Sequence, residues 1–264
     1  MAFAGSRPSY VPPSALLLAA ELPRAAMEAA ALAPTWPLLR RAPKGDGHPV
    51  LVLPGFGASD LSTRILRSFL RDRGYHGHAW RLGRNLGPNP TTVAGLRERI
   101  AELASRYNRT MTLIGWSLGG IYAREIARAA PSVVRQVITL GSPLRLRDRQ
   151  ASNASLIFEA VTRAAPHPML VELPPPEEER DPLPVPSTAV YSRTDGIVPW
   201  HSCVEVGTGR CESIEVSGSH VGLGHNPAVL WVVADRLAQP EGTWRPFDQP
   251  RGPARLLFQV PSPS

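Results

Sequence analysis

Residues 112–131 read TLIGWSLGGIYAREIARAAP. A short apolar run leads to Ser117, which has Gly115 two positions before it and Gly119 two positions after it, and a helical pattern then continues to Pro131. An apolar run followed by a helical period is typical of a buried parallel strand that leads into a helix. The stretch therefore predicts a strand, a tight turn at the serine and a helix directly after it.

The two flanking glycines give this turn a steric purpose. A serine at the tip of a very tight strand-to-helix turn has a strained backbone, and a side chain at either flanking position would collide with neighbouring elements. The turn lifts the Ser117 Oγ clear of the sheet, and the helix that begins at Leu118 directs its N–H groups toward the same place. The pattern Gly-x-Ser-x-Gly also occurs by chance, but here the strand and helix that a nucleophilic serine needs are both present.

The same alternation of strand and helix extends outward from this stretch. A buried run at 50–53 opens into glycines, and later apolar runs are each separated by a helical pattern. Repeated strand-then-helix units are the signature of a doubly wound α/β fold with a mostly parallel sheet. We expect strands at 50–53, 76–81, 110–115, 133–140, 188–192 and 211–216, and helices at 59–73, 91–107, 118–130 and 226–237.

Prolines concentrate outside this core and divide the chain. Residues 1–45 form an N-terminal extension, helical or irregular, in which 14–32 reads as one or two amphipathic helices. The core domain spans 46–239, and residues 240–264 are expected to form an irregular tail. Helix 14–32 covers an edge of the core in one interpretation and docks on a membrane surface in the other.

An insertion at about 144–186 interrupts the alternation of strands and helices and predicts a small cap or lid. A helix at 152–164 carries an apolar stripe that includes Ile157 and Val161, and this stripe must be buried. It either covers the mouth above Ser117 or packs as an ordinary helix on the sheet edge. The acidic run at 177–180 is expected to stay in water.

Composition argues against several classes of partner. The net charge is +7, but the 29 basic residues, with Lys44 as the one lysine, are spread along the chain without interleaved aromatic residues. We therefore expect no nucleic-acid partner. No stretch of 18 apolar residues and no standard secretory signal is present, which predicts a cytoplasmic protein or one peripheral to a membrane. The oligomeric state is left open.

Three motifs resemble those of the α/β-hydrolase superfamily, of the bacterial lipase and esterase type. They are LVLPGFGAS at 51–59, GWSLGG at 115–120, and the pair YSRTDGIVPW at 191–200 with GSHVGLGHNP at 218–227. Together they frame 48–237 in the order Ser, Asp, His that this fold uses. One departure is Pro54, which stands where the family usually has a histidine.

The resemblance implies a role for each motif. Ser117 would be the nucleophile, His220 its base and Asp195 the acid that orients the base. The backbone N–H groups of Phe56 and Leu118 would form the oxyanion hole. Neither a metal nor an organic cofactor is implied.

Two of these assignments have rivals in the sequence. His225 is the nearest alternative base, although it lies at the start of the last predicted helix. Asp195 precedes Gly196, and an aspartate before a glycine is also common in ordinary turns.

The predicted activity is cleavage of carboxylic esters, by a lipase or esterase, through a covalent acyl-enzyme. Acyl transfer and thioester cleavage use the same site, and a hydrolase-fold binding module without catalysis is the alternative from another class. The substrate is expected to be a small-molecule or lipid ester, contacted by Trp80, Trp116, Ile157 and Val161. The two cysteines, Cys203 and Cys211, either form a disulfide, which would imply export by an unusual route, or remain free thiols.

Overall fold

The computed structural model describes residues 10–146, 151–155, 174–207 and 209–258. In this part of the chain, parallel strands form a six-stranded sheet in the order β2-β1-β3-β4-β5-β6. The strands are β1 (Pro49–Leu53), β2 (His76–Ala79), β3 (Met111–Trp116), β4 (Val134–Leu140), β5 (Ser187–Tyr191) and β6 (Cys211–Glu215). The strand order reverses at β1, and ligands of open α/β sheets bind at the carboxyl ends of strands beside such a point.

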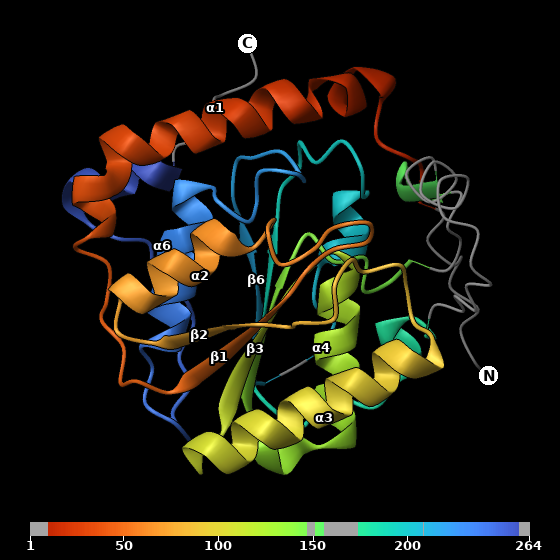
Figure 1. Cartoon of the computed structure of the whole chain (residues 1–264). Helices are drawn as coiled ribbons and strands as arrows, with labels where there is room; N and C mark the ends of the chain where they lie inside the picture. Colours follow the sequence, from red (N-terminus) through yellow and green to blue (C-terminus); the bar gives the residue numbers. More distant parts are fainter. Residues whose placement is uncertain (1–9, 147–150, 156–173, 208, 259–264) are drawn as a thin grey trace, which may run out of the picture.

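Helices cover both faces of this sheet (Figure 1). On one face lie α2 (Arg64–Asp72) and α6 (Pro227–Leu237), and on the other lie α3 (Pro90–Tyr107) and α4 (Leu118–Ala129). Short 3₁₀ turns complete the described elements: η1 (Pro131–Val133), η3 (Glu177–Glu179), η4 (Trp200–Cys203) and η5 (Gly252–Phe258). The predicted doubly wound α/β fold is confirmed.

The four central strands, β1, β3, β4 and β5, are buried on both faces, because their side chains point alternately to the two sides of the sheet and helices cover both sides. The edge strands β2 and β6 are only partly buried. In β1, Val50 and Val52 join the core under α2 and α6, whereas Leu51 and Leu53 join the core under α3 and α4. This burial explains why β1 and β3 read as largely apolar runs in the sequence.

The predicted helix at 59–73 starts later, at Arg64. Residues before it form hydrogen-bonded turns, and the Asp60 carboxylate accepts hydrogen bonds from the backbone N–H groups of Trp80 and Arg81, both at 3.1 Å. The turn is therefore fastened to the chain just after β2, which ends at Ala79 rather than at 81.

From residue 10 on, where the structure describes it, the N-terminal extension contains one helix, α1 (Ala15–Leu39), which is longer than the predicted 14–32. Its charged residues, Glu21, Arg24 and Glu28, all make contacts with other segments of the protein. Its exposed positions carry only apolar side chains: Ala15, Leu16, Ala19, Leu22, Pro23, Ala26, Met27, Ala30, Ala33, Pro34 and Pro37. No helix in the described part of the chain is long and apolar enough to cross a membrane.

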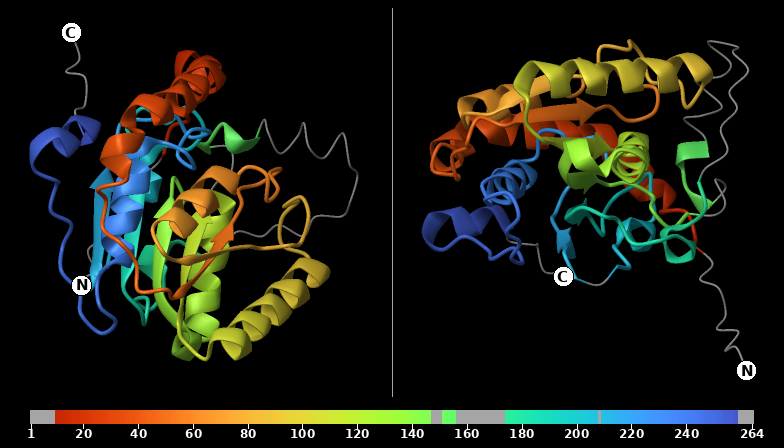
Figure 2. Two further views of the ribbon diagram at one scale, coloured as in Figure 1. Left: turned by 60° about the vertical axis from the view of Figure 1, so that its left-hand side comes forward. Right: turned by 90° about the horizontal axis from the view of Figure 1, so that it is seen from below.

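The segment after α6 packs along the outside of the core. Phe247 and Phe258 lie against the core cluster under α6, and the Phe247 N–H donates to Glu212 at 2.7 Å. Figure 2 shows η5 beside the layer that contains α6.

The acidic run at 177–180 is predicted to stay in water; Glu178 and Glu179 are exposed, but Glu177 is not. Glu177 is only 8% exposed, because its carboxylate pairs with Arg124 (2.9 Å) and Arg128 (2.5 Å) of α4. Arg124 also pairs with Glu205, so it lies between two buried carboxylates. The chain that returns to the sheet is thus held to α4 by ion pairs. Ile157 and Val161 lie outside the described residues, and the lid stays a prediction.

Both cysteines are free thiols in the structure. Cys203 is buried, and Cys211 is partly exposed at the start of β6. Burial raises the pKa of both thiols.

Glycines allow α4 to approach the sheet very closely. A Cβ on Gly119 would lie 2.3 Å from the Leu53 carbonyl oxygen of β1, and a Cβ on Gly115 would lie 2.3 Å from the Gly119 carbonyl oxygen. These are backbone atoms, which cannot rotate away. The start of α4 therefore sits where only hydrogen atoms fit between helix and sheet.

This packing predicts the effect of a methyl group. Gly119→Ala should lower the free energy of unfolding by about 1–3 kcal/mol through overpacking, although alanine is ordinarily the better helix residue. Gly95→Ala in α3 is the matched control, because its Cβ would meet only the movable end of the Leu82 side chain. That variant should be neutral, or stabilised by up to about 1 kcal/mol. Urea unfolding of both variants measures the difference, and equal stability would contradict the packing argument.

Candidate active site

The backbone at Ser117 is strained. This residue joins β3 to α4 with φ 52° and ψ −121°, a region that side-chain-bearing residues rarely adopt. Its N–H donates to the Leu140 carbonyl oxygen of the neighbouring strand β4 at 2.8 Å. The turn predicted from Gly-x-Ser-x-Gly is present, and it holds the serine at the carboxyl edge of the sheet.

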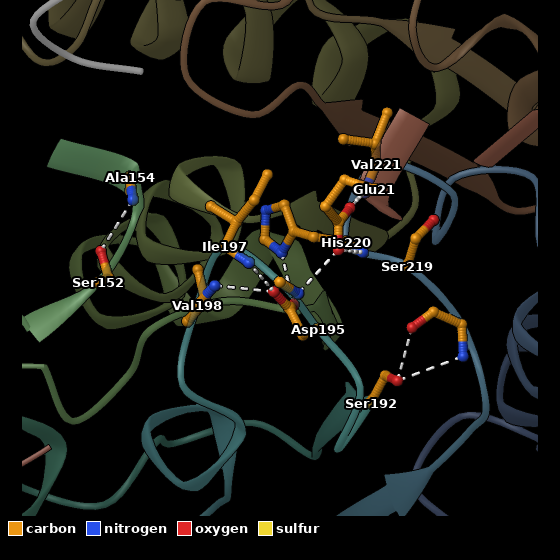
Figure 3. A network of polar contacts seen from close by, with 12 residues as sticks. Glu21, Ser152, Ala154, Ser192, Asp195, Ile197, Val198, Ser219, His220 and Val221 are labelled. Atoms are coloured by element: carbon orange, nitrogen blue, oxygen red, sulfur yellow. Dashed lines mark hydrogen bonds and ion pairs between the residues drawn. The ribbon is translucent and has the colours of Figure 1, made fainter. Parts of the chain in front are cut away.

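Asp195 and His220 meet at the same edge, after β5 and β6 respectively. The His220 Nδ1 lies 2.6 Å from the Asp195 Oδ2, and the two residues are 5% and 3% exposed (Figure 3). The other carboxylate oxygen, Oδ1, accepts hydrogen bonds from the N–H groups of Ile197 (2.8 Å) and Val198 (2.7 Å). These two backbone hydrogen bonds fix the orientation of the Asp195 carboxylate, whose other oxygen contacts the imidazole.

The pKa of His220 lies above its ordinary value of 6.5. Burial disfavours the charged imidazolium and lowers the pKa, but the charge and hydrogen bond of Asp195, joined by the charge of Glu21, outweigh it. The site is thus built to accept a proton on His220.

Ser117 and His220 both lie next to the end of β4. A Cβ on Gly141, the residue after Leu140, would lie 3.0 Å from the His220 Nδ1. The imidazole therefore packs over Gly141, directly beside the backbone that bonds Ser117. The Ser117 hydroxyl makes no hydrogen bond to any residue that the structure describes. Catalytic hydrogen bonds are often long in proteins without substrate and shorten when it binds.

The loop after β1 lies against the serine. A Cβ on Gly55 would be 3.3 Å from the Ser117 Cβ, so the loop that carries Phe56 borders the turn. On the other side of Ser117, Leu118 opens α4, and the first N–H groups of a helix have no partner within it. Both predicted oxyanion donors thus belong to segments that adjoin the serine.

Asn85 holds this loop in place. It is fully buried, its amide donates to the Pro54 carbonyl oxygen at 2.8 Å, and its backbone accepts from the Gly57 N–H at 2.7 Å. Its contacts are those of a support for the loop.

The two tryptophans predicted to contact substrate make internal contacts instead. Trp80 is 1% exposed, its indole N–H donates to Gly83, and it lies in the core under α3 and α4, so it offers no surface to a ligand. The Trp116 indole N–H donates to the His220 carbonyl oxygen at 3.1 Å, and its ring backs onto Gly224. Trp116 therefore supports the loop of His220.

His225, the rival base, points elsewhere. Its Nε2 lies 2.9 Å from the Ala25 carbonyl oxygen in α1. His48 directly precedes β1, at the amino ends of the strands, and its ring contacts the side chains of Asp46 and Thr112. Among the described residues, no cluster of three or more His, Cys, Asp or Glu could hold a metal ion.

Sequence reasoning missed the part that α1 plays at this site. Glu21 is 3% exposed and bonds the loops of both Asp195 and His220. The available signal was spacing, since Glu21, Arg24 and Glu28, the only charged residues of α1, lie three, four and seven positions apart on one helix face.

Comparison with known proteins supports the fold. No protein-family model and no curated protein matches the sequence. Among solved structures, lipase B of Aspergillus fumigatus is similar with a TM-score of 0.54 and 16% identity, over 80% of this chain and 56% of that one. The chain thus spans little more than half of that lipase.

Two other similar structures are matched over nearly their whole length. A pyrethroid hydrolase from Sphingobium faniae has a TM-score of 0.53 and 17% identity, over 74% of this chain and 98% of that one. A monoacylglycerol lipase from Paleococcus ferrophilus has a TM-score of 0.51 and 14% identity, over 73% and 96%. At these identities the similarity shows that the chain shares the α/β-hydrolase fold.

Proposed function

We propose that this protein is a serine hydrolase that cleaves carboxylic esters through a covalent acyl-enzyme. One observation carries the proposal: Ser117 lies on a strained turn at the same sheet edge as a buried, hydrogen-bonded His220–Asp195 pair. Strain at a single serine is retained where the surrounding structure enforces it, as at a nucleophile. The lipases and hydrolase that share the fold make an ester the favoured substrate.

The hydrogen bond between His220 and Asp195 determines the tautomer of the neutral imidazole. The Nδ1–H donates to Asp195, so the lone pair of the neutral ring is on Nε2. In the acylation step, the Ser117 Oγ attacks the ester carbonyl carbon while its proton moves to this Nε2. The negative charge of Asp195 stabilises the imidazolium that forms.

The carbonyl oxygen becomes an oxyanion in the tetrahedral intermediate. The N–H groups of Phe56 and Leu118 are the proposed donors, and one such donor is worth about 3 kcal/mol. Collapse of the intermediate breaks the ester C–O bond, and the alcohol leaves with the proton from His220. A water molecule then attacks the acyl-enzyme by the same route, which releases the acid and frees Ser117.

Replacing the nucleophile should abolish turnover. Ser117→Ala should lower kcat for p-nitrophenyl esters by about four orders of magnitude or more without loss of thermal stability. Ser142→Ala is the matched control, because Ser142 is a buried serine at the same sheet edge, and it should keep most of the activity. Substantial turnover by Ser117→Ala would mean that another residue is the nucleophile.

The base assignment is tested separately. His220→Ala should cost about as much as Ser117→Ala, because the two side chains act as one unit. His225→Ala loses only a contact with α1 and should stay largely active. In the unmodified enzyme, kcat/KM should fall on the acid side as His220 becomes protonated, with a midpoint above pH 6.5. An inactive His225→Ala beside an active His220→Ala would reverse the assignment.

A further inference from the structure

Helix α1 lies across the two loops that carry Asp195 and His220. The Arg24 guanidinium donates to the Thr194 carbonyl oxygen (2.6 Å) and to its Oγ1 (2.7 Å), beside the acid. A Cβ on Gly196 would lie 2.4 Å from the Leu17 carbonyl oxygen, so the helix backbone touches the acid loop. The helix is thus in direct contact with the backbone that sets the position of Asp195.

The Glu21 carboxylate bonds both loops at once. Its Oε1 accepts hydrogen bonds from the N–H groups of Gly196 (2.7 Å) and His220 (3.0 Å), and its Oε2 accepts from Val221 (2.9 Å). Figure 3 shows this carboxylate beside His220 and Val221. One side chain therefore fastens the residue after the acid, the base itself and the residue after the base.

We propose that Glu21 is a positioning residue, which fixes the Asp195–His220 pair from outside the sheet and adds its negative charge to that of Asp195 in favour of the imidazolium. This proposal rests on the proposed function, since it assigns the pair a catalytic task. Hydrogen bonds to a carboxylate are stronger than neutral ones, and in a buried site they hold the loops rigidly.

Among the described residues, Asp195 and Glu21 are the charged groups that act on the pKa of His220. Asp195 faces the imidazole from the loop after β5, and Glu21 faces its backbone from α1. The other charged groups of α1 bind elsewhere, Arg24 to Thr194 and Glu28 to Ser219 and Asn226. Burial lowers the pKa of His220, whereas first Asp195 and then Glu21 raise it. Removing the Glu21 charge should therefore lower this pKa.

Glu28 supplies a matched control from the same helix. Its Oε1 accepts from the Ser219 N–H at 2.7 Å, and its Oε2 accepts from the Asn226 side chain at 3.2 Å. It accepts no hydrogen bond from Gly196 or His220, so it does not join the loop of Asp195 to the loop of His220. A purely structural role for α1 predicts similar effects of both carboxylates.

The experiment compares Glu21→Gln with Glu28→Gln. Glu21→Gln keeps the shape of the side chain but removes the charge and turns an NH₂ group toward N–H donors. It should lower kcat about tenfold or more, the effect of losing a hydrogen bond to a charged group, with KM little changed. Its kcat/KM profile should begin to fall at a lower pH than that of the wild type. Glu28→Gln should leave both the acid limb and kcat close to wild type.

A second variant covers the case in which Glu21→Gln does not fold. Glu21→Asp keeps the charge but shortens the side chain by one methylene, so kcat should fall while the acid limb stays in place. NMR titration of His220 supplies a readout that does not depend on turnover. A lower His220 pKa in Glu21→Gln, but not in Glu28→Gln, supports the proposal.

Failure of this proposal differs from failure of the proposed function. An unchanged His220 pKa and acid limb in Glu21→Gln, with kcat reduced no more than in Glu28→Gln, would overturn the role of Glu21. An unshifted pKa with a wild-type kcat in Glu21→Asp would do the same. A wild-type protein that cleaves no ester would refute the proposed function, and the NMR titration would then decide the Glu21 proposal alone.

Discussion

The close approach of α4 to β3 and β1 is the constraint on which the rest of the structure depends. Gly115 and Gly119 leave no room for a side chain between the helix and the backbone of the sheet. With the helix this near, the chain between β3 and α4 can turn only through a conformation with positive φ, and Ser117 occupies it. The serine is consequently placed at the carboxyl ends of the strands by packing that involves two strands and a helix.

The proposed acid and base, Asp195 and His220, are positioned in a different way. Their loops follow the last two strands, β5 and β6, and are joined near the sheet by Ser192, whose Oγ donates to the Gly218 carbonyl oxygen at 2.7 Å. Farther from the sheet, the helix α1 holds them through Glu21. The charged residues of α1 are used on these inner contacts, and its exposed positions are apolar as a result. The N-terminal extension is therefore part of the site's framework.

The sequence predicted the features that depend on local pattern. Apolar runs located the central strands, and the glycines around Ser117 located the turn, because both effects act within a few residues. The edge strand β2, HGHA, has no such run, and its end was predicted two residues too late. Contacts between distant residues could not be predicted in this way. Glu21 bonds Gly196 and His220 across 175 and 199 positions. Glu177 is buried beside Arg124 and Arg128, which lie 53 and 49 positions away and neutralise its charge. Trp80 looked available to a ligand, yet its place in the core depends on how α3 and α4 pack.

The central claim is that Ser117 is the nucleophile of a serine hydrolase. The most direct measurement is to treat the native protein with a fluorophosphonate, digest it and locate the adduct by peptide mass spectrometry. The predicted result is one phosphonate per chain on the Ser117 hydroxyl, with labelling lost in Asp195→Asn or greatly slowed, because the imidazole is then no longer held in the reactive orientation. An adduct on any other residue, or ester turnover by a protein that forms no adduct, would contradict the claim.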